Sequence, residues 1–349
     1  MGRRILITGI AGHLAGTLAR RLEEDPEVDA VVGVDLRPPR VELERTEYVR
    51  ADIRNPLILK VLQTTEVDTL IHMSILAAPP RAGGRGQMKE MNVIGTMQLF
   101  AACQRAEHLR NVVMKSTTAV YGAGPRNPAM YTEDMSARES PQGGYAKDAV
   151  EIEQYARQLA RRRPELGLTT LRFANFIGPE IRSSLTRYFE LPVVPRPLGF
   201  DPRLQFVHEN DALDALERVT IGRHRGLYNV AADGIVLLSQ ALRLLGRPSF
   251  PVAVPLGAPL AAVLRRLGRV DFSADQLSLL IHGRVVDNAR IKRELDWTPR
   301  YTTSEALMDF ARGRKLRRAA TRERIADWEE DLQAFLRRTR QARFERSSR

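Results

Sequence analysis

Tyr145 and Lys147 are the residues whose types and spacing most directly suggest proton transfer. They lie two residues apart in the stretch SPQGGYAKDAVE, residues 140–151. A lysine close to a tyrosine lowers the phenol pKa from about 10, so that tyrosinate can accept a proton near neutral pH. Two residues are roughly 200° apart around a regular helix, so Tyr145 is expected to point away from the face that carries Lys147. On that geometry, removing the Tyr145 hydroxyl is expected to have only a small effect.

A glycine-rich turn near the N-terminus has the residues of a phosphate-binding loop. The apolar stretch RRILIT leads into TGIAGHLAG, which places Gly9 and Gly12 in a turn and Ala15 at the start of a helix. Gly9 permits the tight turn, and Gly12 lets a pyrophosphate approach the N–H groups and positive dipole of the helix N-terminus. Because the glycines follow a strand and open a helix, the pattern predicts a dinucleotide site.

Two acidic residues downstream indicate which dinucleotide is bound. Asp35 ends the apolar run AVVGVD, at the distance where a carboxylate accepts hydrogen bonds from the adenosine ribose. Its charge repels a 2′-phosphate, which favours NAD over NADP, although Arg37 would partly offset the repulsion. Asp52 is placed to reach the adenine, with Ile53 covering the face of the ring. A solvated turn aspartate is the alternative interpretation of Asp52.

The alternation of short apolar runs with amphipathic stretches predicts the fold class. Strands that alternate with helices form parallel βαβ units, so we expect an α/β fold with a Rossmann-like doubly wound parallel sheet. The strands are expected at residues 4–8, 30–35, 69–74, 111–116 and 168–173.

The chain is expected to divide into three parts. The first is an NAD-binding Rossmann domain of residues 1–178, with a returning segment of about 203–232. The second is a smaller C-terminal substrate lobe of residues 179–202 and 233–310, and the third is a basic amphipathic helical tail of residues 311–349.

The basic character of the chain is concentrated in this tail. The net charge is +12, and residues 311–349 alone carry a surplus of 7 positive charges. Ile325, Trp328, Leu332 and Phe335 recur at helical spacing and give the tail one apolar face. A charged helix docked on its own domain, a membrane-surface contact and an acidic partner are the open interpretations. Aromatic residues for base stacking are too few, so no nucleic-acid binding is expected.

Other features limit the location and chemistry of the protein. No apolar run approaches the roughly 20 residues of a membrane-spanning helix, and the N-terminus lacks a signal-peptide pattern, so we expect a cytoplasmic protein. The single cysteine, Cys103, cannot form an internal disulfide and is expected to be a core residue. His72 and His208 have no partner at metal-ligand spacing, so no metal site is expected.

Many sequence elements, in order, resemble one family. The chain resembles the extended short-chain dehydrogenase/reductases, specifically the NAD-dependent epimerase/dehydratase family that acts on nucleotide sugars, over roughly residues 3–310. The elements are TGIAGHLA, LIHMS, MNVIGTMQLFAAC, KSTTAVYG, LRFANFIGP, LQFVHENDALDA, LYNVAADG and VVDNARIKRELDWTP, with Asp35 and Asp52. The resemblance implies NAD as cofactor, a nucleotide-sugar-like substrate such as that of a 4-epimerase, and a homodimer formed by the helices that begin near Asn92 and Tyr145.

The resemblance also implies roles for individual residues. Thr117 would face the substrate with its hydroxyl, and Asn175 and Arg203 would bind the substrate, with Asn175 at its diphosphate. Asn92 would brace the sheet near the nicotinamide. The residues implied around the cofactor are Gly9, Gly12, His13, Leu14, Asp35, Asp52, Ile53, Met73, Ser74, Asn92, Lys147 and Phe173.

The tyrosine and lysine depart from the family pattern. In the family they lie four residues apart on one helix face, the lysine binding the cofactor ribose. In KDAVE, Glu151 follows Lys147 by four residues, which matches the family's spacing from lysine to glutamate and identifies Lys147 as the lysine. The tyrosine position, four residues before Lys147, is then occupied by Gly143. Three interpretations stay open. The first is an active enzyme that uses a displaced Tyr145, an irregular helix start at Gly143 and Gly144, or a substrate-borne group as its base. The others are a catalytically weak NAD-binding regulatory protein and an interaction protein that acts through its basic tail.

Overall fold

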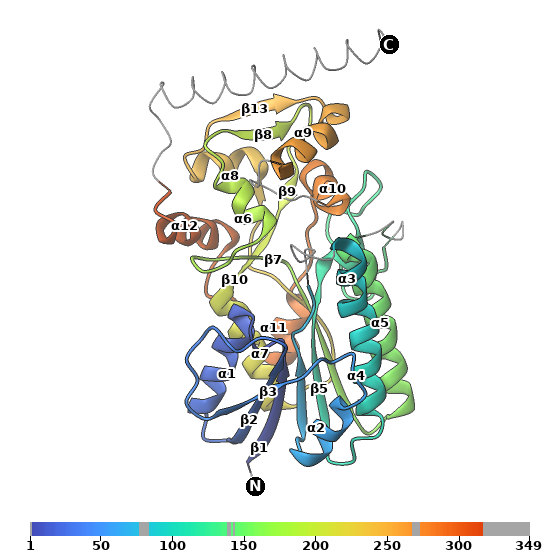
Figure 1. The fold of residues 1–349 in the computed structure, drawn as a ribbon. Helices are drawn as coiled ribbons and strands as arrows, with labels where there is room; N and C mark the ends of the chain where they lie inside the picture. The colour runs from blue at the N-terminus through green and yellow to red at the C-terminus, as the bar shows by residue number, and fades with distance from the viewer. Residues whose placement is uncertain (1, 77–83, 138–140, 142–143, 267–272, 317–349) are drawn as a thin grey trace, which may run out of the picture.

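The computed structural model describes residues 2–76, 84–137, 141, 144–266 and 273–316 (Figure 1). Within these ranges the chain forms a large α/β domain, with a smaller lobe beyond the carboxyl ends of its central strands. Gly143 lies outside the described residues. Residues 317–349, which make up most of the predicted tail, also lie outside them.

A seven-stranded parallel sheet forms the centre of the large domain, in the order β11-β6-β5-β4-β1-β2-β3. The central strands are apolar on both faces, as expected for a sheet covered on both sides by helices. The strand order reverses between β1 and β4, which opens a crevice at their carboxyl ends. The strands are β1 (Arg3–Thr8), β2 (Val28–Asp35), β3 (Thr46–Arg50), β4 (Thr69–His72), β5 (Asn111–Thr117), β6 (Gly167–Phe173) and β11 (Gly226–Val230).

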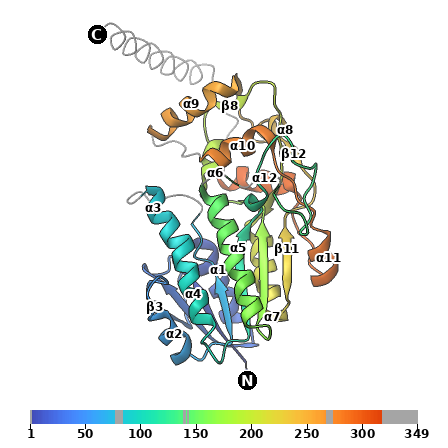
Figure 2. The same cartoon turned by 90° about the vertical axis from the view of Figure 1, so that its right-hand side faces the viewer.

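Helices cover both faces of the sheet (Figure 2). One face packs against α1 (His13–Glu24), α7 (Glu209–Gly222) and α11 (Ala289–Leu295), and the other against α2 (Ile58–Thr64), α4 (Gly95–Cys103) and α5 (Gly144–Arg162). The short helix α3 (Gly84–Lys89) and a π-helical turn (Glu90–Ile94) precede α4. This arrangement confirms the predicted Rossmann-like doubly wound sheet.

The smaller lobe has its own apolar core, in which Phe189, Phe206 and Phe310 are fully buried. It combines short strand pairs with short helices, because turns and prolines interrupt this part of the sequence. The strands are β7 (Asn175–Ile177) with β10 (Phe206–His208), β8 (Val194–Pro197) with β13 (Ser249–Val252), and β9 (Arg203–Leu204) with β12 (Val236–Leu237). The helices are α6 (Ser184–Phe189), α8 (Leu238–Leu244), α9 (Val254–Arg266), α10 (Ala274–His282) and α12 (Thr303–Gly313).

Candidate active site

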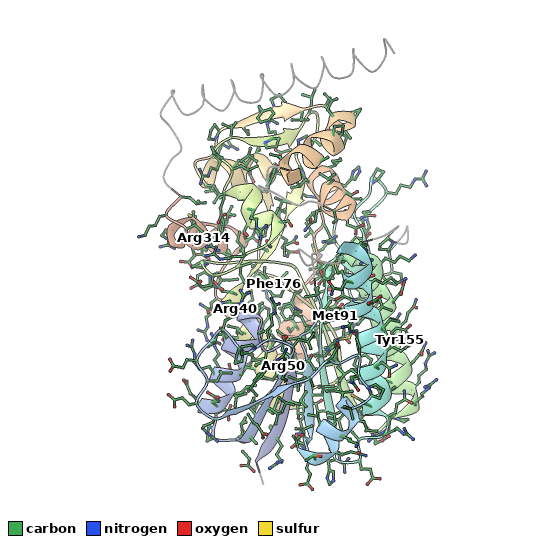
Figure 3. The ribbon with its side chains drawn as sticks, in the orientation of Figure 1. Arg40, Arg50, Met91, Tyr155, Phe176 and Arg314 are labelled. Atoms are coloured by element: carbon green, nitrogen blue, oxygen red, sulfur yellow. The ribbon has the colours of Figure 1, made fainter. Side chains whose placement is uncertain are left out.

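A cavity of about 600 Å³ lies where the carboxyl ends of the central strands meet the small lobe. The large domain contributes the turn after β1, the ends of β4 and β5 and the first turn of α5, and the small lobe contributes residues of α6 and α10. Arg40 and Phe176, both labelled in Figure 3, also line the cavity. Its position is the switch point of the sheet, where open α/β sheets bind ligands.

The glycine turn has the shape that a pyrophosphate requires. Gly9 has φ +77°, and a Cβ at that position would lie 3.0 Å from the Cα of Ser74. Gly12 is the N-cap of α1 and offers no side chain to the first N–H groups of the helix, and the first turn carries no acidic residue. His13 and Leu14 line the cavity together with both glycines. Uncapped N–H groups that face a cavity fit the phosphates of a dinucleotide.

Two carboxylates predicted to contact the adenosine are held differently. Asp35 ends β2 beside the glycine turn, and its carboxylate accepts the backbone N–H groups of Ala11 at 3.3 Å and Arg37 at 3.1 Å. Asp52 is ion-paired with Arg54 at 2.6 Å, and this hydrogen bond lowers the pKa of Asp52. Neither carboxylate lines the cavity of the described residues. Asp35 is held at the edge of the turn, whereas Asp52 already has a cationic partner.

The other predicted cofactor residues lie around the end of β4. Met73 lines the cavity, and Ser74 follows it at the contact with Gly9. Asn92 is buried and braces this region: its side-chain amide accepts the N–H of Leu76 at 2.8 Å and donates to the Leu76 carbonyl at 2.9 Å.

Of three further predicted residues, Asn175 lines the cavity, whereas Phe173 and Ile53 do not. Phe173 is buried at the end of β6 and contacts Phe176, with ring centroids 5.1 Å apart, so Phe176 and not Phe173 reaches the cavity. Asn175 lines the cavity, as predicted for a substrate residue. Ile53 is buried and packs against Gly95, where a Cβ would lie 2.9 Å from the Ile53 Cδ1 atom.

Thr117 and Tyr145 meet in the cavity. Thr117 ends β5, Tyr145 lies in the first turn of α5, and their side chains are hydrogen-bonded. Burial raises the pKa of Tyr145 to about 12, against the hydrogen bond from Thr117 and the positive charge of Arg284, which both lower it. The expectation that Tyr145 points away from the site is wrong. Lys147, two residues on, is exposed and is not among the cavity residues.

The contacts of α5 shift the predicted motif by two residues. Ala149, four residues after Tyr145, is buried, and Glu153, four residues after Ala149, accepts hydrogen bonds from Arg172 at 2.6 Å and from Ser116 at 2.6 Å. The family steps of four residues also fit Tyr145, Ala149 and Glu153, and Lys147, the predicted lysine position, does not line the cavity. Tyr145 lies on the face of Ala149 and Glu153 because residues four apart share one side of a helix.

Lys115, Arg284 and Asp275 line the cavity but were not predicted from the sequence. Burial lowers the pKa of Lys115 to about 8 and that of Arg284 to about 10. Burial raises the pKa of Asp275, whose carboxylate accepts the Ala146 N–H at the start of α5. Lys115 could have been predicted from the sequence as a cavity residue, because it precedes Thr117 by two residues and therefore lies on the same face of the strand. Asp275 and Arg284 could not, because they come from a lobe distant in sequence.

Arg203 was predicted to bind the substrate, but the structure does not place it in the cavity. It lies on β9 and does not line the cavity, where Arg182 and Arg284 are found instead. Its backbone carbonyl accepts the N–H of Arg284 at 3.2 Å. Arg203 thus contacts the backbone of a residue that reaches the cavity.

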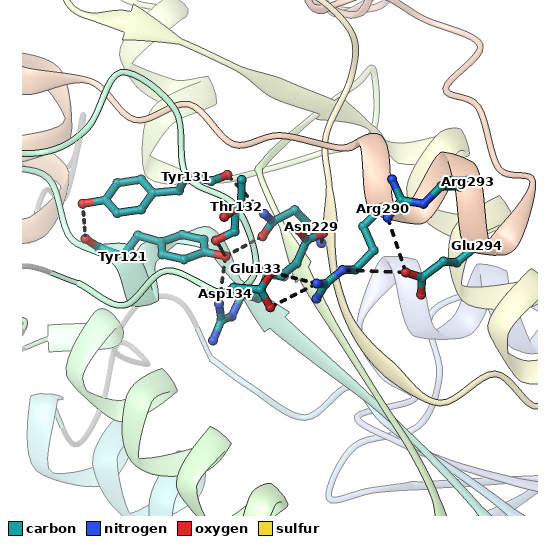
Figure 4. Close-up of polar contacts among 10 residues, drawn as sticks. Tyr121, Tyr131, Thr132, Glu133, Asp134, Asn229, Arg290, Arg293 and Glu294 are labelled. Atoms are coloured by element: carbon teal, nitrogen blue, oxygen red, sulfur yellow. Dashed lines mark hydrogen bonds and ion pairs between the residues drawn. The ribbon is translucent and has the colours of Figure 1, made fainter.

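A polar network supports the segment that follows Thr117 (Figure 4). The Tyr121 hydroxyl donates to Asn229 of β11 at 2.8 Å and accepts from Arg172 at 2.8 Å. Tyr131 stacks on Tyr121, with ring centroids 4.5 Å apart, and donates to its carbonyl at 3.1 Å. These contacts hold the end of β5, and hence Thr117, against the sheet.

Two negative findings apply to the described part of the chain. His72 is buried between Thr8 and Thr96, and His208 contacts Asp309 at 3.2 Å; no group of three or more potential metal ligands is found among the residues described. Within the same ranges, no helix has the length and apolarity that crossing a membrane requires.

Comparison with known proteins identifies the family. The NAD dependent epimerase/dehydratase family matches residues 5–230, so the chain belongs to this family, as its motifs predict, and NAD is the family's cofactor. An uncharacterized protein of Mycobacterium tuberculosis (strain H37Rv) is 45% identical over 331 residues, which cover 93% of this chain and 88% of that protein. The UDP-glucose 4-epimerase of Mycolicibacterium smegmatis is 26% identical over 323 residues, covering 87% and 96%.

Solved structures share the fold at low identity. MoeE5 in complex with UDP-glucuronic acid and NAD superposes with a TM-score of 0.70 and 22% identity, covering 89% of this chain and 99% of that one. UDP-glucose 4-epimerase of Thermotoga maritima with UDP-glucose gives a TM-score of 0.66 and 19% identity, covering 89% and 98%. The described fold is therefore that of the extended epimerases and dehydratases.

Proposed function

We propose that this protein is an NAD-dependent enzyme that oxidises and re-reduces the sugar of a nucleotide sugar, with 4-epimerisation as the favoured reaction. The observation that carries the proposal is the hydrogen-bonded pair of Thr117 and Tyr145 in one cavity with the glycine turn. The solved relatives that bind NAD together with UDP-glucuronic acid or UDP-glucose support the same substrate class.

The nicotinamide of NAD would accept a hydride from the sugar carbon and return it. Tyr145, as tyrosinate, takes the proton of the sugar hydroxyl while the carbonyl forms, and gives it back when the carbonyl is reduced. Thr117 hydrogen-bonds to Tyr145 and, from the end of β5, is placed to orient the same sugar hydroxyl. Each proton leaves and returns through Tyr145, so the full cycle consumes neither acid nor base.

The charges of the cavity suit a substrate that carries a diphosphate. Arg182 and Arg284 line the cavity, as does Asn175. Guanidinium groups bind phosphate oxygens through charge-assisted, often bidentate hydrogen bonds. We assign the substrate diphosphate to these two arginines, and the sugar to the space between them and Tyr145.

A second candidate function is favoured by one observation. Ala149 occupies the helix position that the family fills with lysine, and burial raises the pKa of Tyr145, which disfavours the tyrosinate. On this alternative the protein binds NAD and a nucleotide sugar with little turnover and acts as a regulatory protein.

The two candidates are separated by turnover with UDP-glucose and UDP-galactose. The first predicts interconversion of the two sugars, followed by chromatography of the nucleotide sugars, and transient NADH absorbance. Tyr145→Phe should lower the rate by about 10²- to 10⁴-fold while NAD affinity changes little, because only the general base is lost. Tyr155→Phe is the matched control, since Tyr155 lies on the same helix outside the cavity (Figure 3). NAD binding without conversion of any nucleotide sugar would favour the second candidate.

A further inference from the structure

Helix α5 has no cation on the face that carries Tyr145. The position one turn after Tyr145 is Ala149, which is 2% exposed and packs in the core with Val120 and Phe173. Lys147 points to solvent from another face of the helix. A tyrosine that must ionise therefore finds no positive charge on its own helix, although an opposite charge close by is what favours an ionised group.

Strand β5 carries a lysine two residues before Thr117, on the face opposite to the one that packs against α5. Lys115 and Thr117 alternate with Ser116 on β5, so both point to the cavity side of the sheet, about 6.6 Å apart along the strand. Thr117 bonds to Tyr145, and Lys115 lines the cavity with both. Ser116 points to the opposite face, where it donates to Glu153.

The side-chain amine of Lys115 has no hydrogen-bond or ion-pair partner among the residues described, although the side chain is partly buried. A lysine in such a place loses part of its hydration without gaining a protein partner, which costs free energy. A ligand group in the cavity would offset that cost.

We propose that Lys115 of β5 replaces the lysine that helix α5 lacks at Ala149: its ammonium group approaches from the strand, stabilises ionised Tyr145 and binds the ribose of the dinucleotide. The proposal rests on the proposed function of this cavity. It assigns the role of the family lysine to a different element of the fold, and it excludes Lys147 from that role.

Some of the other charged groups around the cavity have partners within the protein. Arg284 donates to the Thr118 hydroxyl and to the Gly122 carbonyl, both at 3.2 Å. Asp148 of α5 is ion-paired with Arg85 at 2.6 Å, whereas the Oδ2 atom of Asp275 in α10 is buried with no hydrogen-bond partner among the residues described. On the β4 side, burial lowers the pKa of His72 to about 3, so this imidazole is neutral beside Lys115. Lys115, Arg40 and Arg182 line the cavity without a hydrogen-bond or ion-pair partner among the residues described, and of these three only Lys115 comes from β5.

The direct test is NAD binding by isothermal titration calorimetry at neutral pH, with no sugar present. Lys115→Met keeps the length of the side chain but removes its charge and donors, and should weaken NAD binding about tenfold to a hundredfold. Lys147→Met is the matched control and should leave the affinity unchanged, because Lys147 is exposed. Equal affinities of wild type and Lys115→Met, or a loss confined to Lys147→Met, would overturn the proposal.

A second pair of variants separates this role from a structural one. Lys115→Ala should lose affinity as Lys115→Met does, and Lys115→Ala combined with Ala149→Lys should regain most of it, because the amine then enters from the helix. If Lys115 had only a structural role, a lysine on helix α5 would not restore NAD affinity. Failure of a folded double variant to regain NAD affinity therefore counts against the proposal. If Lys115→Met does not fold, Lys115→Gln serves instead.

A pH profile gives a third readout. Since burial lowers the pKa of Lys115 to about 8, the ammonium is charged below that pH and neutral above it. NAD affinity of the wild type should therefore decline as the pH rises through about 8, whereas Lys115→Arg should keep its affinity to higher pH. A decline of the same size in both proteins would contradict the assignment. None of these measurements requires sugar turnover, so their failure is distinct from failure of the proposed function.

Discussion

Replacing Glu153 by glutamine is expected to lower the free energy of unfolding by about 3 to 5 kcal/mol. Glu153 and Arg172 are 4% and 7% exposed. The carboxylate accepts hydrogen bonds from Arg172 Nη2 at 2.6 Å and Nε at 2.9 Å, and from the Ser116 hydroxyl at 2.6 Å. Glutamine keeps the shape but not the charge, so the guanidinium stays buried without a counter-charge. Urea denaturation measures the loss as a shift of the midpoint at a constant slope.

Glu151→Gln is the matched control for this prediction. Glu151 lies two residues earlier and is only partly buried, so the same substitution should change the free energy of unfolding by no more than about 0.5 kcal/mol. The comparison tests which glutamate anchors α5, and with it the two-residue shift that brings Tyr145 to the cavity. Equal losses in the two variants, or a larger loss in Glu151→Gln, would refute the reasoning.

Three further predictions follow from the site and the surface. NAD should bind more tightly than NADP, because the Asp35 carboxylate repels a 2′-phosphate, and Asp35→Asn should reduce the difference between the two affinities. Competition titration measures the affinity for each dinucleotide, and equal affinities in the wild type would contradict the prediction. Sedimentation should show a dimer at micromolar concentration that Ile94→Glu converts to a monomer, because Ile94, directly before α4, is 41% exposed; a wild-type monomer would reject the dimer. Truncation after Leu316 should leave NAD affinity unchanged, because every residue that lines the cavity precedes residue 285; lost affinity in a folded truncated chain would show that the tail reaches the site.

The fold and the dinucleotide turn could be predicted from the sequence because their signals are local. Apolar runs such as those of β1 and β5 form strands buried on both faces, and their alternation with helices requires a parallel sheet. Gly9 must be glycine because its φ is positive and the backbone after β4 passes close by. Thr117 was implied by the resemblance of the short motif KSTTAVYG to the family. Each of these conclusions needs only the neighbours of a residue along the chain.

The face of α5 that meets the cavity was decided by tertiary structure. Spacing alone made Lys147 and Glu151 the motif residues, because a step of four residues fits them as well as it fits Ala149 and Glu153. The choice between the two registers depends on the ion pair of Glu153 in α5 with Arg172 in β6, a contact between two elements that the spacing within α5 does not reveal.

The sequence by itself therefore determined the family, the sheet and the phosphate turn. Only the packed structure decided that Tyr145 faces Thr117, that Lys147 faces solvent and that Lys115 shares the cavity. The physical reason is that a helix has a side chain on every face. Which of them becomes part of the site is fixed by the charges and cavities of the elements against which the helix packs.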